Sequence, residues 1–445
     1  MGQILFPLPN SSFTDFLITL SASDVQNLKS GLLYINVHSS NFLNGEIRGQ
    51  FVTATSASSV QLSSASYLAS EASGRATITF TRLGDTSAAA DVAYETSDTA
   101  GGNNCNMING TASSRCDYTS TIGTVHFDAG EKLKTVNIPV TDDAYAEGNE
   151  TFTISLSNPV GASLGSPGAA TITITDNESV AGANPIDVTN FFVHQHYIDF
   201  LNREPDPSGF AFWINEIDLC GTNQQCIEVK RINVSAAFFL SIEFQETGFL
   251  VYRMYKAAYG NLPSAPVPLK LNEFLPDTQQ LGKGLVVGQT GWEQQLENNK
   301  VAFALDFVSR ARFTTAYPTT LMPAQFVDML YVNAGVTPSD SERMSLIGEF
   351  GSATDTADTV ARGRALRRVA ENSIFKQQET NRAFVLMEYF GYLRRNPNDP
   401  PEAGLNFDGY NFWLGKLNQF NGNFVNAEMV KAFIVSGEYR HRFGP

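Results

Sequence analysis

The apolar residues of this chain change their spacing once, near Asp187, and this change constrains the fold most strongly. Between residues 56 and 180 they alternate with polar residues, and turn residues interrupt the runs at short intervals. Clear alternation occurs at residues 76–81, 136–140, 152–156 and 172–174. A period of two is typical of half-buried strands in an antiparallel sandwich. After Asp187 the period is helical, so we expect an all-β part followed by an all-α part.

The first 55 residues form a separate β-like segment. Leu33, Ile35 and Val37 alternate with more polar neighbours and predict one strand, and residues 45–51 predict a turn and a second strand. Ser23 and Gly31 fit the ends of a short helix over residues 24–29. Met1 opens this segment without the basic and apolar leader that export requires.

The helical half contains a diverged internal repeat. The residues Phe192, Val193, Tyr197, Leu201 and Pro205 recur as Phe384, Val385, Tyr389, Leu393 and Pro397, with weaker copies at Tyr255 to Pro263 and at Phe326 to Tyr331. A second shared element runs over residues 238–244 and 433–439. Repeated helix pairs with aromatic faces bury those faces by stacking on their neighbours, so we expect the aromatic residues to form a core.

Length and charge exclude several classes of protein. A chain of 445 residues predicts about three domains. The 30 Lys and Arg residues against 45 Asp and Glu residues give a net charge of −15, which argues against nucleic acid as the main partner. Hydrophobic residues make up 42% and charged residues 17%, so the chain is expected to fold. No apolar run approaches the roughly 18 residues that span a bilayer.

The four cysteines fall into two local pairs. Cys105 and Cys116 close one short loop, and Cys220 and Cys226 close another. Such pairs favour two disulfides in an oxidising compartment. Free thiols and a zinc site are the alternatives, but the spacing is not that of a zinc knuckle and no histidine lies nearby.

Acidic residues lie at the predicted strand ends of the sandwich. They are Glu71, Asp98, Asp117, Asp142, Asp143, Glu147 and Asp176. Strand ends can meet at one pole, where carboxylates would repel one another unless a hard cation lay among them, and calcium takes six to eight oxygen ligands from such loops. The alternatives are solvated loop acids and a carboxylate pair for glycoside hydrolysis.

Other catalytic patterns are missing from the sequence. His194 and His196 lie two apart on a predicted helix, so they point to opposite sides, and we expect one to be packed and one exposed. Residues 282–284 lack the spacing of a phosphate-binding loop. The helical metalloprotease motif and the glycine-flanked serine of hydrolases are also missing. We therefore expect a protein that is not an enzyme.

Three resemblances add to this interpretation. The stretch Gly31 to His38, followed by Gly45 to Gln50, resembles the last third of a CHRD domain, the β module named after chordin. The missing strands would lie upstream of Met1, so we expect a fragment or a gene start placed too late, with the signal peptide upstream.

Residues 66–178 resemble a Calx-beta domain. The residues that carry the likeness are Glu71, Thr96 to Ala100, Asp117-Tyr118, Phe127 to Glu131, Asp142-Asp143, Glu147, Glu150 to Phe152 and Ile172 to Asn177. The family implies an immunoglobulin-like sandwich that binds calcium at one pole. The implied ligands are Glu71, Asp98, Asp117, Asp142, Asp143 and Asp176. The chain departs from the family where a glycine should follow Asp98 and where the Cys105–Cys116 insertion lies beside the site.

Residues 188–445 look like the helical family called domain of unknown function 4214. The likeness rests on residues 192–197, residues 202–209 and Phe212-Trp213, and on a second copy from Tyr389 to Trp413. This family brings no established activity and resembles parts of secreted and surface proteins of bacteria.

These inferences predict a multidomain chain. Its parts are a partial CHRD β module (1–55), an immunoglobulin-like Calx-beta sandwich (56–179), a linker (180–187) and an all-α helical repeat domain (188–445). We expect a bacterial, exported cell-surface or matrix protein that binds calcium and meets protein or glycan partners, with no nucleic acid and no membrane span. A self-associating subunit of a surface layer or filament is one alternative. A polysaccharide-acting enzyme or carbohydrate-binding protein is the other.

Overall fold

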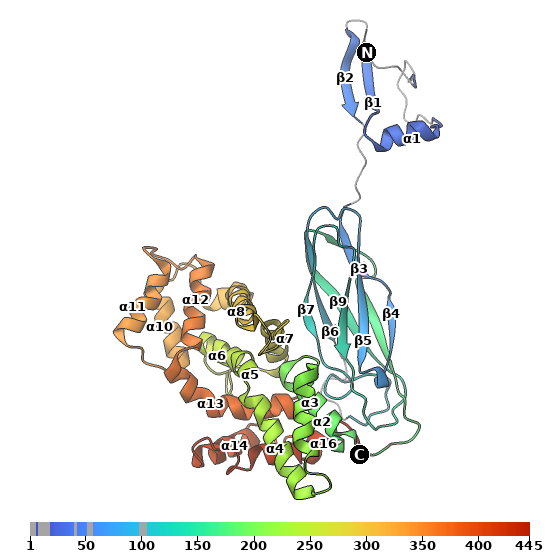
Figure 1. Cartoon of the computed structure of the whole chain (residues 1–445). Coiled ribbons are helices and arrows are strands. Elements are labelled where there is room, and N and C mark those ends of the chain that lie inside the picture. The colour runs from blue at the N-terminus through green and yellow to red at the C-terminus, as the bar shows by residue number, and fades with distance from the viewer. Residues whose placement is uncertain (1–5, 8–17, 40–41, 51–56, 98–104) are drawn as a thin grey trace.

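The computed structural model describes residues 6–7, 18–39, 42–50, 57–97 and 105–445 (Figure 1). The candidate ligand Asp98 lies outside these described residues.

The N-terminal part contains a short helix and an antiparallel hairpin. The helix is α1 (Ala22–Lys29), and the hairpin consists of strands β1 (Tyr34–Ser39) and β2 (Phe42–Gln50). The helix begins two residues earlier than predicted, because Ser21 caps it rather than Ser23. The Ser21 hydroxyl accepts from the Asp24 amide, and the Asp24 carboxylate accepts from the Ser21 amide. This reciprocal pair satisfies two amides at the start of the helix.

Two sheets pack face to face in the second part. One has the order β10-β3-β5-β8 and the other β4-β11-β9-β6-β7. The strands are β3 (Ser59–Leu62), β4 (Ser66–Ser70), β5 (Arg75–Leu83), β6 (Ala90–Ser97), β7 (Ile122–Phe127), β8 (Leu133–Pro139), β9 (Glu150–Val160), β10 (Ser163–Leu164) and β11 (Ala169–Thr175). Most pairs are antiparallel as expected, but β3 pairs with β10 and β4 with β11 in parallel. The chain crosses from one sheet to the other between β3 and β4, which places both strands beside late segments.

The alternating residues form the core of this sandwich. Ala76, Ile78 and Phe80 of β5 are buried between the sheets, whereas Thr77 points to solvent. The same pattern continues through β9 and β11. The period of two therefore predicted the inward face correctly.

Helices make up the rest of the chain. They are η2 (Pro185–Asp187), α2 (Thr189–Leu201), α3 (Pro207–Asp218), α4 (Gln224–Leu240), α5 (Ile242–Glu246), α6 (Gly248–Tyr259), α7 (Leu271–Gly282), α8 (Trp292–Ser309), α9 (Ala311–Ala316), α10 (Pro323–Ala334), α11 (Asp340–Ile347), η3 (Gly348–Phe350), α12 (Thr359–Ala370), α13 (Ser373–Glu388), η4 (Tyr389–Leu393), α14 (Asp408–Gln419), α15 (Met429–Ile434) and α16 (Gly437–Arg440). The repeated aromatic residues lie in one continuous core, as predicted.

The first and last copies of the repeat share two further features. Ser241 caps α5 and Ser436 caps α16, each by accepting from an amide three residues on at 3.1 Å. Glu243 binds Arg203 through two hydrogen bonds of 2.7 and 2.9 Å. Glu438 binds Arg395 in the same way, at 2.6 and 3.0 Å. The two copies thus share a partly buried ion pair as well as a core.

By length and composition, none of the described helices could cross a membrane alone. One bent pair, Gln224–Glu246 with Gly248–Tyr259, passes that test when its members are taken together.

Candidate metal site at one end of the sandwich

One end of the sandwich gathers eight acidic residues, which we call the acidic pole. They are Glu71, Asp117, Asp142, Asp143, Glu147, Glu150, Asp176 and Glu178. They come from the short helix η1 (Glu71–Ser73), from the loops before β7 and after β8, from the first residue of β9, and from the segment after β11. Strands of both sheets end here, which brings residues far apart in sequence together (Figure 1).

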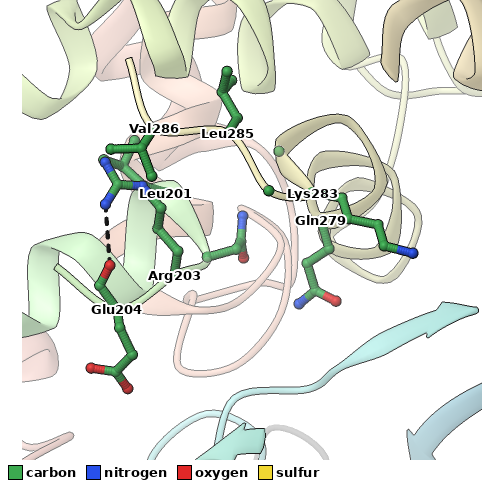
Figure 2. Close-up of a pocket in the computed structure, with 10 residues that line it drawn as sticks. Leu201, Arg203, Glu204, Gln279, Lys283, Leu285 and Val286 are labelled. Atoms are coloured by element: carbon green, nitrogen blue, oxygen red, sulfur yellow. Dashed lines mark hydrogen bonds between the residues drawn. The ribbon is translucent and has the colours of Figure 1, made fainter. Parts of the chain in front are cut away.

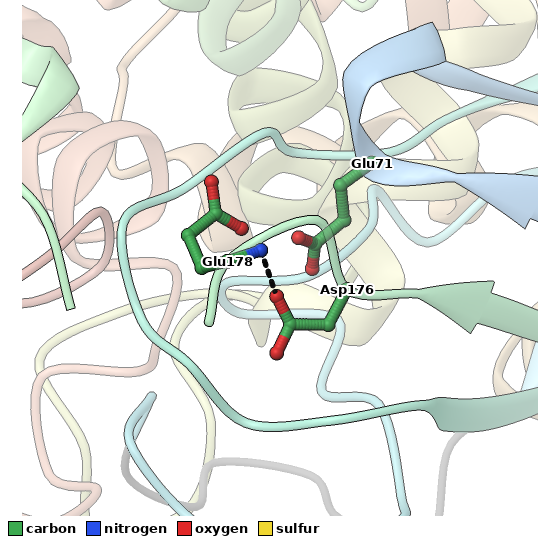
Figure 3. A group of neighbouring side chains, drawn as sticks. All are labelled: Glu71, Asp176 and Glu178. Carbon is green, nitrogen blue, oxygen red and sulfur yellow. Dashed lines mark hydrogen bonds between the residues drawn. The ribbon is translucent and has the colours of Figure 1, made fainter. Parts of the chain in front are cut away.

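Glu71, Asp176 and Glu178 form the first group of the acidic pole. Each offers one carboxylate oxygen, and these oxygens all lie within 4.8 Å of one another. Figure 3 shows the three side chains converging from η1 and from the end of β11. Asp176 is held in place by three amides, because its oxygens accept from Glu147 at 2.8 Å, Gly148 at 2.6 Å and Glu178 at 2.6 Å.

Asp117, Glu147 and Glu150 form the second group, again with three carboxylate oxygens within 4.8 Å of one another. All three residues are buried. Asp117 accepts from the Ser113 amide at 2.5 Å, which fixes its loop. The Cys105–Cys116 disulfide, with a Cα–Cα distance of 5.6 Å, ends one residue before Asp117. The disulfide therefore anchors the loop that carries this ligand candidate.

Several oxygens of the acidic pole are buried without a partner. Asp143 is 4% exposed, and its Oδ1 accepts from the Tyr145 amide at 2.7 Å. Asp143 Oδ2, Asp142 Oδ1, Glu71 Oε2 and Glu178 Oε2 have no hydrogen-bond partner among the residues that the structure describes. Within the same described ranges, Glu71, Asp143 and Glu178 form no ion pair with lysine or arginine. Leaving a buried carboxylate oxygen unpaired costs free energy.

This crowding shifts the protonation equilibria. Burial raises the pKa of Glu71 to about 9, and repulsion from Asp176, Glu178 and Asp117 adds to that shift. Burial likewise raises the pKa of Asp143 to about 9 and that of Glu147 to about 8. Burial and Asp117 raise the pKa of Glu150. Burial also opposes ionisation of Asp176, but the backbone hydrogen bonds outweigh it and lower its pKa.

The donor set fits a hard divalent cation. Calcium prefers carboxylate oxygens in groups of six to eight, and the acidic pole offers two neighbouring groups of three. A cation among them would supply the missing partner of each buried oxygen. It would also reverse the repulsion that favours protonation, because a bound ion is the largest local charge in such a site.

The structure brings most of the predicted ligands together. Glu71 and Asp176 share the first group, and Asp117 belongs to the second. Asp142 and Asp143 lie at the same pole, where Asp143 repels Glu71 and Asp117. Asp98 lies outside the described residues. Whether these residues bind a metal stays a prediction.

Sequence reasoning counted Glu147 among the strand-end acids but did not include Glu147, Glu150 or Glu178 in the implied ligand set. A signal existed for Glu150, because it stands in register with Phe152 and Ile154 of β9, whose side chains point inward. A glutamate at an inward position predicts a buried carboxylate. Glu178 follows the last strand and carries no comparable pattern.

A cavity of about 340 Å³ lies between the loop after α2 and the end of α7, and no residue of the acidic pole lines it. Its lining includes Leu201, Arg203, Gln279 and Lys283 (Figure 2). Arg203 is already bound to the Glu204 carbonyl at 3.1 Å and to Glu243. Both ends of the guanidinium are therefore engaged within the protein.

Both cysteine pairs are joined. Cys105 bonds Cys116, and Cys220 bonds Cys226 with a Cα–Cα distance of 5.5 Å.

Comparison with known families places two parts of the chain. Residues 54–178 match the Calx-beta domain family. Residues 2–51 match the CHRD domain. The Calx-beta match covers the whole acidic pole. Because the CHRD match ends before the Calx-beta match begins, the predicted order of CHRD before Calx-beta is confirmed. The likeness of the helical half to domain of unknown function 4214 stays a prediction.

Two curated relatives match part of the chain. The adhesion G-protein coupled receptor V1 of Danio rerio is 36% identical over 90 residues, which are 20% of this chain and 1% of the receptor. The extracellular matrix organizing protein FRAS1 of Mus musculus is 35% identical over 118 residues, which are 25% of this chain and 3% of that protein. The chain thus spans a small fraction of either relative.

Two solved structures also match part of the chain. The apo-form Calx CBD1 domain is 32% identical, with a TM-score of 0.24, and the match covers 27% of this chain and 99% of that one. The calcium binding domain CBD12 of CALX1.1 is 33% identical, with a TM-score of 0.24, over 26% of this chain and 45% of that one.

Proposed function

We propose that the sandwich is a calcium-binding module of an exported protein that works in adhesion or in a matrix, without catalysis. The buried, unpartnered oxygens of Glu71 and Asp143 are the observation that carries the proposal. They are deeply buried and face other carboxylates, a state that a bound cation stabilises. The Calx-beta match and the matrix and adhesion relatives support the same reading.

The residues that would hold the ion are those of the acidic pole: Glu71, Asp117, Asp142, Asp143, Glu147, Glu150, Asp176 and Glu178. Calcium would supply positive charge that fixes the loops carrying these residues, so binding adds to the stability of this end of the sandwich. A module with fixed loops can present a defined surface to protein or glycan partners. The two disulfides fit an oxidising, extracellular compartment. A bacterial source and a signal peptide upstream belong to the same proposal.

Thermal unfolding of the full chain tests this function. At saturating calcium we expect the melting temperature of the sandwich to rise by roughly 5–10 °C over the chelated protein, because a ligand at about 100 times its Kd stabilises by about 2.7 kcal/mol. The double variant Glu71→Gln, Asp143→Asn should lose this rise. It should also melt higher than the wild type in chelator, because an amide carries no charge that must be neutralised when it is buried.

Glu95→Gln is the matched control. Glu95 is an exposed acid on β6 of the same sandwich, so this variant should keep the full response to calcium. A wild-type melt that is identical in calcium and in chelator would contradict the proposed function.

A further inference from the structure

The loops that carry the acidic pole also hold the helical half of the chain. Two of them contact the C-terminal segment that contains α16 (Figure 1). In each loop a candidate calcium ligand and an interface residue stand one or two positions apart. The candidate metal site and the interface between the two halves therefore share the same short pieces of backbone.

The first shared loop runs over residues 113–118. Asp117 belongs to the acidic pole, and Arg115 points to the helical half. Arg115 donates to Glu438 at 2.5 Å and to the Leu393 carbonyl at 3.1 Å. The Arg115 carbonyl accepts from Arg442 at 3.0 Å. Three hydrogen bonds thus tie this loop to η4 and to the region of α16.

The second shared loop follows β8. Asp143 belongs to the acidic pole, and the next two residues contact the end of the chain. The Ala144 amide donates to the Phe443 carbonyl at 3.0 Å, and the Tyr145 hydroxyl donates to the His441 carbonyl at 3.2 Å. A movement of Asp143 would displace both donors, because they belong to the next two residues of the same loop and the Tyr145 amide donates to Asp143.

The helical side of this interface is itself well fixed. Glu438 is shared between Arg115 of the sandwich and Arg395 of the helical half. Arg442 is 2% exposed and binds Asp199 through hydrogen bonds of 2.8 and 3.0 Å. Buried charges of this kind need their partners in place, so the interface has one well-defined arrangement.

We infer that the acidic pole and the interface with the helical half form one cooperative unit, so that calcium bound at the pole locks the two halves together. The inference rests on the proposed function. Without calcium, the buried oxygens of Asp142 and Asp143 lack the partner that the ion supplies, so the shared loops are held less firmly and the docking weakens. By linkage, docking must strengthen calcium binding by the same factor as calcium strengthens docking.

Calcium titration of the full chain by calorimetry tests the inference with two matched variants. Glu438→Gln breaks the contact with Arg115 from the helical side and leaves the sandwich unchanged. We expect it to weaken calcium binding at least fivefold. Glu243→Gln removes the equivalent acid in the first repeat, which binds Arg203 within the helical half, and should leave the affinity unchanged.

A second measurement needs no variant. Hydrogen exchange of the wild type should slow at residues 437–444 when calcium chloride is added, although these residues offer no ligand to the pole. Equal affinity in Glu438→Gln and wild type, or unchanged exchange at residues 437–444, would overturn the inference and leave the proposed function standing. A wild type that binds no calcium would overturn both.

Discussion

At the scale of single residues, His196 shows how the helical core depends on one protonation state. His196 lies in α2 and is fully buried. Its Nδ1 lies 2.7 Å from the Phe192 carbonyl, which can only accept, so Nδ1 carries the proton. Its Nε2 then accepts from Ser235 at 2.8 Å, and Ser235 also contacts the Tyr392 hydroxyl. Burial favours the neutral imidazole, whose Nδ1 donates to Phe192 and whose Nε2 accepts from Ser235.

We expect the helical half to lose about 2 kcal/mol of unfolding free energy through His196 between pH 7 and pH 5. Burial lowers the pKa of His196 from 6.5 to about 4, so between these values the unfolded chain binds the extra proton. This contribution is therefore complete above pH 6.5 and is lost as the pH falls toward 4. Urea unfolding followed by tryptophan fluorescence measures it, because Trp213, Trp292 and Trp413 all lie in the helical half.

The matched variant is His196→Gln, which keeps a side chain that can hydrogen-bond but cannot titrate. Its unfolding free energy should change less between the two pH values than that of the wild type. Parallel pH profiles for the two proteins would show that His196 is not the group responsible.

Residue-level prediction from sequence succeeded where a residue type has few stable environments. His196 is packed and His194 is partly exposed, as their spacing required. Asp206, which directly precedes Pro207, caps α3 by accepting from the Gly209 amide at 2.8 Å, and an acid before a proline is a common start of a helix. The close approach at Gly391 left no such signal. A Cβ atom there would lie 1.9 Å from the Phe200 ring, and only the packing of α2 against η4 reveals it.

At the scale of elements, strand β7 shows how a sheet edge is covered. β7 is the last strand of the five-stranded sheet. The Gln279 side chain of α7 accepts from the Ile122 amide at 3.0 Å and donates to the Ser120 carbonyl at 2.7 Å. One turn on, Lys283 donates to the Thr124 carbonyl at 3.2 Å. The side-chain amide of Gln279 thus takes the place of a neighbouring strand. Because uncovered strand edges promote association, this contact protects the edge of the sheet.

Gln279→Ala should destabilise the chain by about 0.5–1.5 kcal/mol, because two backbone groups lose their partners. It should also increase self-association by exposing the edge of β7. Urea unfolding and light scattering over a range of concentrations measure the two effects. Gln280→Ala, on the same helix, is the control and should behave as the wild type. A Gln279→Ala protein that stays as stable and as monomeric as the control would refute this role.

Element prediction was most accurate where the periodicity was strong. The inward faces of β5, β9 and β11 follow the period of two. The parallel pairing of β3 with β10 and of β4 with β11 was not predicted, because it depends on where the chain crosses between the sheets and not on the local sequence pattern. The interface was not predicted either, since contacts such as that between Arg115 and Glu438 join residues 323 positions apart.

At the scale of the whole molecule, the predicted succession of a β module, a sandwich and a helical half is present. The exact boundaries at residues 55, 179 and 187 stay predictions. Segment 180–187 contacts both halves. The Gly182 amide donates to the Ala144 carbonyl, and the Asn184 side chain donates to the carbonyls of Arg440 and Gly444. Composition alone indicated a small, polar linker and could not show this docking.

Anomalous scattering from crystals grown in calcium chloride tests the central claim most directly. We expect a calcium peak among the carboxylates of Glu71, Asp176 and Glu178 or of Asp117, Glu147 and Glu150, and no peak in crystals of the Glu71→Gln, Asp143→Asn variant. Acidic-pole side chains that stay in place without any calcium peak in the wild type would contradict the account.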